Sequence, residues 1–136
     1  MTENTNLLIK DISARIPYGV KCQCADDNLI ATIIGIKFHE NQCFVELDYK
    51  DFKGIVEIEK CKPLLIPMSG MSNEKGMELD NTLINLELKC INDEIETHKI
   101  AEFEIDFYLK NHIDFRGLIP MGIAYNLNTE SNERIN

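Results

Sequence analysis

The sequence predicts an α+β fold, with a small N-terminal SH3-like β-barrel followed by two or three short helices packed on it. Short β-rich runs with tight turns fill residues 8–66, and a stretch containing proline and glycine changes the pattern at 62–76. Apolar residues at helical spacing follow in 99–112. A chain of 136 residues is most simply one domain. We expect a barrel part at 8–66, a helical part at 67–128 and a polar tail at 129–136.

The strands of the predicted barrel are short and joined by tight turns. Two β-rich runs, 30–38 and 42–47, are separated by His39, Glu40 and Asn41, which is the spacing of a hairpin. A Pro-Tyr-Gly turn at 17–19 precedes a further strand. Closing such strands into a barrel would remove exposed strand edges. The expected strands are 20–24, 30–38, 42–47 and 54–61.

Two prolines separate the strand-rich half from the rest of the chain. Pro63 and Pro67 argue against a regular central strand or helix across 62–76, because proline has no backbone N–H to donate. Ser72 is a candidate helix N-cap. A short helix is expected to follow it, through about Asp80.

The C-terminal half carries mixed signals. Residues 82–91 fit a helix or a strand, and the sequence leaves that choice open. An acidic loop is expected at 92–98, and a helix in the second half of 99–112. Glycine and proline then prevent a long helix. A helical turn at 115–119 and a loop or strand at 121–127 are expected instead.

Composition and charge argue against several classes of function. The formal net charge is −9, so the Lys and Arg surface needed for non-specific nucleic-acid binding is missing. No apolar run approaches the roughly 20 residues of a membrane helix. The first ten residues lack the pattern of a signal peptide, and the five cysteines are an odd number. We therefore expect a cytoplasmic protein with reduced thiols and no membrane partner.

Three segments, RIPYGVKC, CKPLLIPMSGMS and YLKNHIDFRGLIPMGIA, occur in this order along the chain. Together they resemble a family of short proteins encoded by phages and prophages of Bacteroides-type bacteria. That family has no assigned activity, so the resemblance implies a bacterial host cell rather than a chemistry. This chain departs from the family pattern after Ile119, where it has Pro-Met-Gly-Ile-Ala. The matching residues are Pro17, Tyr18, Gly19, Lys62, Pro63, Pro67, Ser69, Met71, His112, Asp114, Arg116, Gly117 and Leu118.

His112, Asp114 and Arg116 form the first candidate site. In the functional interpretation, Arg116 offers a planar fork to a carboxylate or phosphate, Asp114 orients a neighbour, and His112 donates to an anion. In the structural interpretation, Asp114 caps the next turn, Arg116 pairs with an acidic neighbour, and His112 closes a helix end. The sequence leaves both open.

Tyr18 and Lys21 form the second candidate site, beside the Pro-Tyr-Gly turn. An aromatic and a cation at the tip of a small barrel would suit a peptide or nucleotide groove, whereas Tyr18 could instead plug the barrel end. Lys62 completes the set of candidate ligand-binding residues. We expect the C-terminal helix to fold back on the barrel, so that Arg116 faces Tyr18.

The cysteines and the serine motif favour a protein without cofactor or metal. Cys22 and Cys24 could form a zinc site with Cys43 and Cys61, but the spacing is not that of a zinc knuckle, and buried apolar thiols are the favoured interpretation. Ser69 lacks the flanking pattern of a nucleophile elbow. No catalytic motif is present, so an enzyme is the less favoured class.

These observations predict a non-enzymatic phage-type binding protein with a counter-defence role. Its expected partner is a host defence protein or a small anionic ligand such as a nucleotide messenger. One alternative is a structural, assembly or replication-accessory phage protein that forms homo-oligomers. A second alternative is a small nucleotide-acting hydrolase that uses His112 and Asp114.

Overall fold

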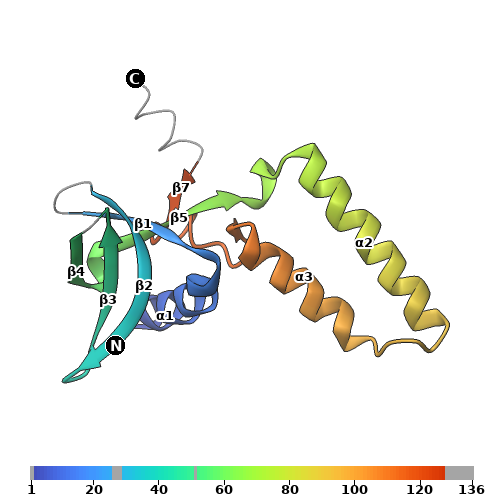
Figure 1. Ribbon diagram of the computed structural model, residues 1–136, viewed down its shortest axis with the longest axis horizontal. Coiled ribbons are helices and arrows are strands. Elements are labelled where there is room, and N and C mark those ends of the chain that lie inside the picture. Colours follow the sequence, from blue (N-terminus) through green and yellow to red (C-terminus); the bar gives the residue numbers. More distant parts are fainter. Residues whose placement is uncertain (1, 26–28, 51, 128–136) are drawn as a thin grey trace.

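The computed structural model describes residues 2–25, 29–50 and 52–127. Across these ranges the chain forms three α-helices and a mixed sheet of seven strands (Figure 1). The predicted α+β class is confirmed. The helices are α1 (Glu3–Arg15), α2 (Asn73–Ile91) and α3 (His98–Lys110). The strands are β1 (Lys21–Cys24), β2 (Ile30–His39), β3 (Gln42–Tyr49), β4 (Phe52–Glu57), β5 (Cys61–Pro67), β6 (Ile113–Asp114) and β7 (Tyr125–Asn126). Short 3-10 helices cover Ile16–Tyr18, Ile58–Lys60 and Met68–Gly70.

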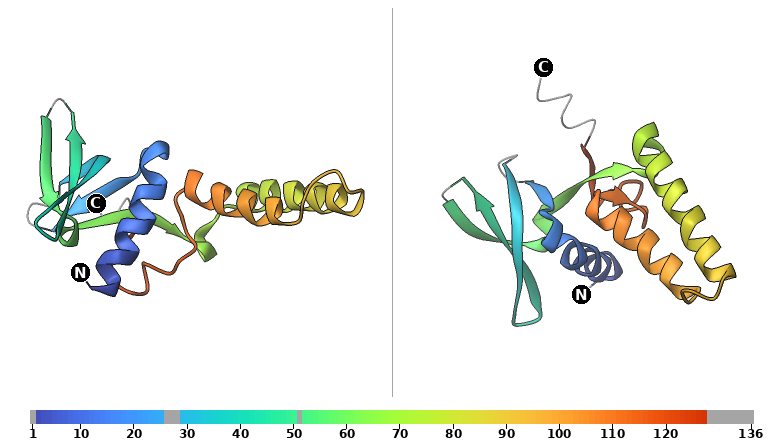
Figure 2. Two further views of the ribbon diagram at one scale, coloured as in Figure 1. Left: turned by 90° about the horizontal axis from the view of Figure 1, so that it is seen from below. Right: turned by 45° about the vertical axis from the view of Figure 1, so that its right-hand side comes forward.

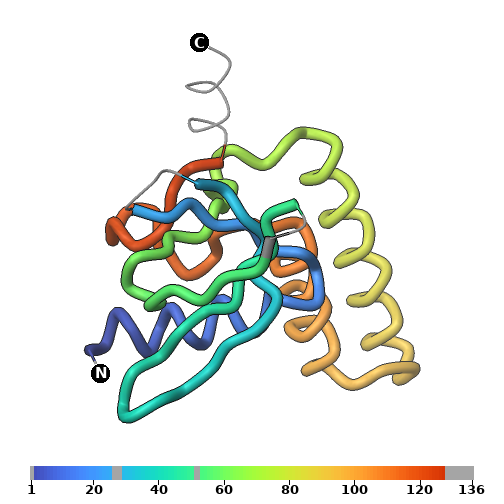
Figure 3. Tube along the Cα trace, turned by 60° about the vertical axis from the view of Figure 1, so that its left-hand side comes forward, coloured from blue at the N-terminus to red at the C-terminus, as the bar shows by residue number. Residues whose placement is uncertain are grey.

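The sheet is open, so the predicted SH3-like barrel is not confirmed. Its strands lie in the order β4-β3-β2-β1-β5-β6, and β7 also pairs with β5. The pairs from β4 to β5 are antiparallel, whereas β6 and β7 join β5 in parallel. Closing the sheet into a barrel would require the outer edge of β5 to pair with β4. That edge instead pairs with β6 and β7, two short strands from the C-terminal part of the chain. This segment returns to the sheet after the helices, as Figure 3 shows.

The first helix, α1, was missed by the sequence analysis, which placed residues from 8 onward in strands and turns. Thr2 caps α1, since its side-chain oxygen accepts a hydrogen bond of 3.1 Å from the backbone N–H of Thr5. Leu8 and Ile12 are buried one turn apart and pack in the main core with the strands. The described N-terminal part is therefore a helix laid against a sheet.

The predicted β2–β3 hairpin is confirmed, with a shorter loop. His39 pairs with Gln42, so only Glu40 and Asn41 form the turn. Both turn residues have positive φ, 48° and 65°. Two residues of this conformation form a turn whose twist matches that of the strands.

The expected break at Pro63 and Pro67 was wrong, because β5 runs through both prolines. Pro63 pairs with Cys22 of β1. The N–H of Ala25 donates to the carbonyl of Lys60 across the same ladder, and antiparallel pairs alternate between bonded and non-bonded. Counting back along the register places Cys22 and Pro63 at a non-bonded pair. Proline is tolerated there, because its missing N–H would not have faced β1.

The helix that follows is longer than expected. Ser72 caps it as predicted, accepting a 3.2 Å hydrogen bond from the N–H of Lys75. The helix continues past Asp80 to Ile91, which settles 82–91 as helical. After the linker, α3 is helical throughout, and α2 and α3 form a hairpin that extends away from the sheet (Figure 2).

The last described segment is turn and strand. Residues 118–122 form turns in place of the helical turn expected at 115–119, and β7 lies within the predicted 121–127. The part at 67–128 therefore contains strands as well as helices. The predicted polar tail at 129–136 lies outside the described residues.

Two apolar clusters hold the described fold together. The main core joins α1, the sheet and the C-terminal turn, and it includes Ile12, Val45, Leu65 and Leu118. A smaller cluster lies at the base of the α2–α3 hairpin, formed by Leu79, Phe107, Tyr108 and Ile113. Leu79 is the one buried residue of α2, so this helix is attached to the body mainly at its first turns.

Candidate functional site

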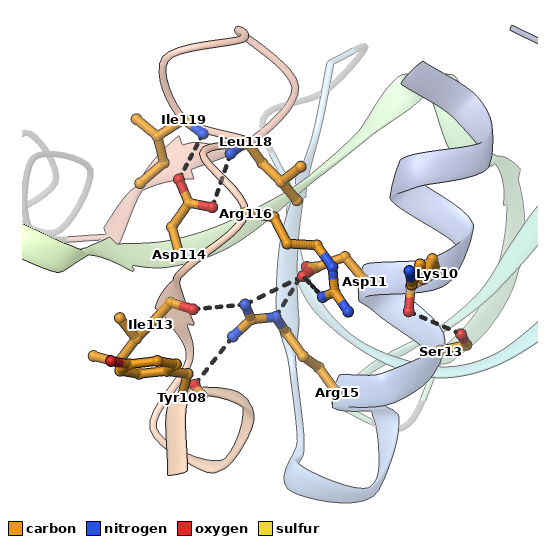
Figure 4. A network of polar contacts seen from close by, with 10 residues as sticks. All are labelled: Lys10, Asp11, Ser13, Arg15, Tyr108, Ile113, Asp114, Arg116, Leu118 and Ile119. Atoms are coloured by element: carbon orange, nitrogen blue, oxygen red, sulfur yellow. Dashed lines mark hydrogen bonds and ion pairs between the residues drawn. The ribbon is translucent and has the colours of Figure 1, made fainter. Parts of the chain in front are cut away.

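A buried ionic network joins α1 to the segment after α3. Arg15 is fully buried and donates to Asp11 through Nε at 2.9 Å and Nη2 at 3.2 Å. It also donates to the carbonyls of Ile113 at 2.6 Å and Tyr108 at 3.4 Å (Figure 4). The carboxylate of Asp11 therefore lies against a guanidinium whose other N–H groups hold the end of α3. A buried charge is stable only with such partners.

Arg116 is the second cation of this network. Its Nη1 lies 3.0 Å from Oδ1 of Asp11, and its side chain is 17% exposed. Its guanidinium also lies over the ring of Phe115, 4.4 Å from the centroid. Asp11 is the acidic neighbour that the structural interpretation required for Arg116. Arg116 thus faces Asp11 and Phe115, and the expected facing of Arg116 and Tyr18 is wrong.

Asp114 caps the turn that follows it. Its two carboxylate oxygens accept hydrogen bonds of 2.8 Å from the backbone N–H groups of Leu118 and Ile119. Figure 4 shows this side chain pointing away from Asp11 and toward the turn. The structural interpretation of Asp114 is therefore confirmed, and both oxygens have a structural use.

His112 ends α3 and contacts the start of the chain. It adopts a positive φ of 57°, and its backbone N–H donates to the backbone carbonyl of Leu109. Burial lowers the pKa of its imidazole, the nearby charge of Arg15 lowers it further, and a hydrogen bond with the backbone of Tyr18 acts in the opposite direction. Lys21 is close enough to contribute a smaller lowering of the same pKa. His112 and Tyr18 are therefore in contact, and Lys21 lies near enough for its charge to act on the imidazole.

Lys62 lies elsewhere. Its ammonium is 4.9 Å from the ring centroid of Tyr125, a cation–π distance. It also lines a pocket of about 130 Å³ together with Glu59 and Cys61. The six predicted ligand-binding residues therefore divide into three places: the end of α3, the ionic network with its cap, and this pocket. Binding of a ligand by any of them stays a prediction.

Tyr18 is 40% exposed and lines a second pocket, of about 170 Å³, between the first 3-10 helix and the α2–α3 hairpin. Lys75 and Lys110 line it, but so do Glu78 and Asp106. The Nζ of Lys75 lies 3.3 Å from Oε2 of Glu78, so these two charges pair with each other. This mixed pocket has no excess of positive charge for an anionic ligand.

One side of α2 is apolar and exposed, which was not expected from the sequence. Met77, Ile84, Leu88 and Ile91 are 64%, 55%, 53% and 75% exposed, and their spacings of seven, four and three place them along one side of the helix. We call these four residues the α2 stripe. The inner side of α2, with Leu79 and Leu83, faces the cluster with α3. A count of apolar positions at helical spacing would have shown two apolar sides, which is unusual for a helix with one neighbour.

Acidic residues lie along one side of the stripe. Asp80 lies three residues after Met77 and four before Ile84, and Glu87 is spaced in the same way between Ile84 and Ile91. Residues 73–110 hold ten carboxylates and four lysines, a formal charge of −6 out of the chain's −9.

No protein family, curated protein or solved structure matches this chain. Among the described residues, no helix is both long enough and apolar enough to cross a membrane.

Proposed function

We propose that this chain is a non-enzymatic, phage-type binding protein that occupies a host protein through the α2–α3 hairpin. The observation that carries the proposal is the α2 stripe, four large apolar side chains more than half exposed on a strongly acidic hairpin. Isolated exposed apolar residues need no explanation, whereas a contiguous row along one helix is typical of an interaction site.

The charge around the stripe specifies the chemistry of the partner. Carboxylates of Asp80 and Glu87 lie beside the stripe, so the complementary surface is apolar with a basic edge. A basic amphipathic helix of a host protein has this pattern. A second copy of this chain would instead bring two hairpins of charge −6 together, which disfavours a homo-oligomer through this face.

A protein partner suits the molecule better than a nucleotide messenger. Sites for small ligands usually have volumes of roughly 300–1,000 Å³. The pockets beside Tyr18 and Lys62 measure about 170 and 130 Å³. A larger, open pocket of about 600 Å³ between α2 and α3 is lined by Asp93, Glu94 and Glu96, whose carboxylates repel an anionic messenger. Arg116, which would have bound the anion, and Asp114, which would have oriented its neighbour, are both bonded within the fold.

Affinity capture with matched variants tests the proposal. The wild-type chain, an Ile84→Glu/Leu88→Glu variant and a Phe38→Glu control are immobilised and exposed to a lysate of a Bacteroides-type bacterium. Phe38 is 61% exposed at the far end of β2, so the control introduces a charge at an equally exposed apolar position. We expect a host protein retained by the wild type and the control and lost with the stripe variant.

The same variants give the results that would contradict the proposal. A host protein retained equally by all three chains, or none at all, argues against binding through the stripe. Self-association that the stripe variant abolishes would support the assembly role instead. A thermal shift caused by a cyclic nucleotide, unchanged in the stripe variant, would support the messenger role.

A further inference from the structure

Three cysteines converge on the core side of the sheet. Cys22 and Cys24 lie two residues apart on β1 and so point to the same face, and Cys61 pairs with Cys24 across the ladder to β5. Their Sγ atoms all lie within 4.8 Å of one another, and those of Cys24 and Cys61 are 3.6 Å apart. We call this group the thiol cluster.

The distances suit a shared metal ion. Thiolate sulfur binds zinc at about 2.3 Å, which in a tetrahedral arrangement separates two sulfurs by about 3.8 Å. The 3.6 Å between Cys24 and Cys61 is close to this value, and the sulfur of Cys22 lies within 4.8 Å of both. Both strands are interior strands of the sheet, which holds the ligands on rigid backbone.

The surroundings select the kind of ion. Cys22, Cys24 and Cys61 are 0%, 5% and 0% exposed, within the main apolar core. Soft thiolate ligands in such a site favour soft ions, such as copper(I), over magnesium or calcium. Cys43 is also buried in this core, but within the described residues the cluster comprises three thiols. Cys61 also borders the 130 Å³ pocket beside Lys62.

We propose that the thiol cluster binds one copper(I) ion. Three thiolates complete a trigonal copper(I) site, whereas a structural zinc ion takes four ligands. As each sulfur–metal bond forms, the thiol gives its proton to solvent. This site is separate from the α2 stripe and does not depend on the proposed function.

Titration of the reduced protein under anaerobic conditions tests the site. Copper(I) is supplied as its acetonitrile complex in the presence of a competing copper(I) chelator, and zinc(II) is titrated in parallel. Native mass spectrometry counts the ions and the protons displaced, and near-ultraviolet charge-transfer absorption reports sulfur ligation. We expect one copper(I) per chain, with zinc(II) held more weakly.

Matched alanine variants locate the ligands. Cys22→Ala, Cys24→Ala and Cys61→Ala should each weaken binding by more than the roughly 10- to 100-fold that losing an outer-shell partner costs. Cys43→Ala removes a thiol that is 1% exposed in the same core and should leave binding unchanged. If a ligand variant does not fold, alkylation of the wild type replaces it: bound copper(I) should protect Cys22, Cys24 and Cys61 and leave Cys43 unprotected. No retained ion, equal binding by the ligand variants, or zinc(II) held as tightly as copper(I) would overturn the assignment.

Discussion

At the scale of single residues, Asp11 has the most demanding position in the molecule. It is fully buried and accepts hydrogen bonds from both Arg15 and Arg116. Removing one member of a buried ion pair leaves its partner's charge uncompensated, which costs more than the pair contributes. The network therefore links α1 to the segment after α3 in a way that tolerates few substitutions.

Asp11→Ala should lower the free energy of unfolding by about 3–5 kcal/mol, because it leaves the buried guanidinium of Arg15 without its carboxylate. Arg116→Ala should cost less, since that side chain is 17% exposed and Asp11 keeps Arg15. Urea unfolding at neutral pH measures both. Glu87→Ala on the exposed side of α2 is the control, expected within about 0.5 kcal/mol of wild type. Equal costs for Asp11→Ala and Glu87→Ala would contradict the network's role.

His112 should make stability depend on pH. Its pKa in the folded chain is lowered from the ordinary 6.5, mainly by burial, so the unfolded chain binds the proton more readily. Its contribution to stability is therefore complete above about pH 6.5, falls as the pH drops below that value, and levels off below the lowered folded-state pKa. His112→Asn keeps a residue type that tolerates positive φ and removes the titration. The loss of stability between pH 7.5 and 5.5 should be smaller in this variant, and an unchanged loss would contradict the assignment.

At the scale of elements, α2 is the least anchored helix of the described fold. It has 19 residues and buries only Leu79. Its stability therefore depends on its N-cap and on α3 rather than on the main core.

Ser72→Ala should cost about 1 kcal/mol and act locally, because the N–H of Lys75 loses its acceptor. Hydrogen exchange should accelerate in the first turns of α2 and stay unchanged in β1 and β2. Thr82→Ala, which removes a hydroxyl bonded to the carbonyl of Glu78 in mid-helix, is the control and should change exchange little. Faster exchange across the whole sheet in Ser72→Ala would show that α2 is not a separate unit.

Local signals predicted the elements that depend on neighbouring residues. The β2–β3 hairpin and the cap at Ser72 each follow from a few adjacent side chains. The helix α1 was missed because its buried side includes Asp11 and Arg15, which break the apolar pattern. Strand β5 was missed because Pro63 is tolerated only by a particular register with β1.

The candidate site shows the same division. The capping role of Asp114 was among the sequence-based alternatives, and the backbone N–H groups that donate to its carboxylate lie four and five residues away. The sequence predicted that Arg116 pairs with an acidic residue but not which one. Asp11 lies 105 positions away along the chain, so no local pattern could identify it. The thiol cluster likewise needs the pairing of β1 with β5, which the proline argument had excluded.

At the scale of the whole molecule, the body and the hairpin differ in character. Figure 1 shows α2 and α3 extending from the sheet, and residues 73–110, which include the linker between the two helices, carry −6 of the net charge of −9. The affinity of the chain for its basic partner should fall as the salt concentration rises from 50 to 500 mM, because the Debye screening length shortens to a few ångströms. Asp80→Asn/Glu87→Gln should weaken binding and flatten this salt dependence, as measured by calorimetry with the captured protein. Affinity that does not change with salt would contradict the charge argument.

Site-specific photocrosslinking tests the central claim most directly. A benzophenone amino acid replaces Leu88 in the α2 stripe in one chain and Phe38 on β2 in another, and both chains are irradiated in the host cell. We predict one discrete adduct with a host protein from position 88 and none from position 38. No adduct at position 88, an adduct only with a second copy of this chain, or the same adducts from both positions would contradict the account.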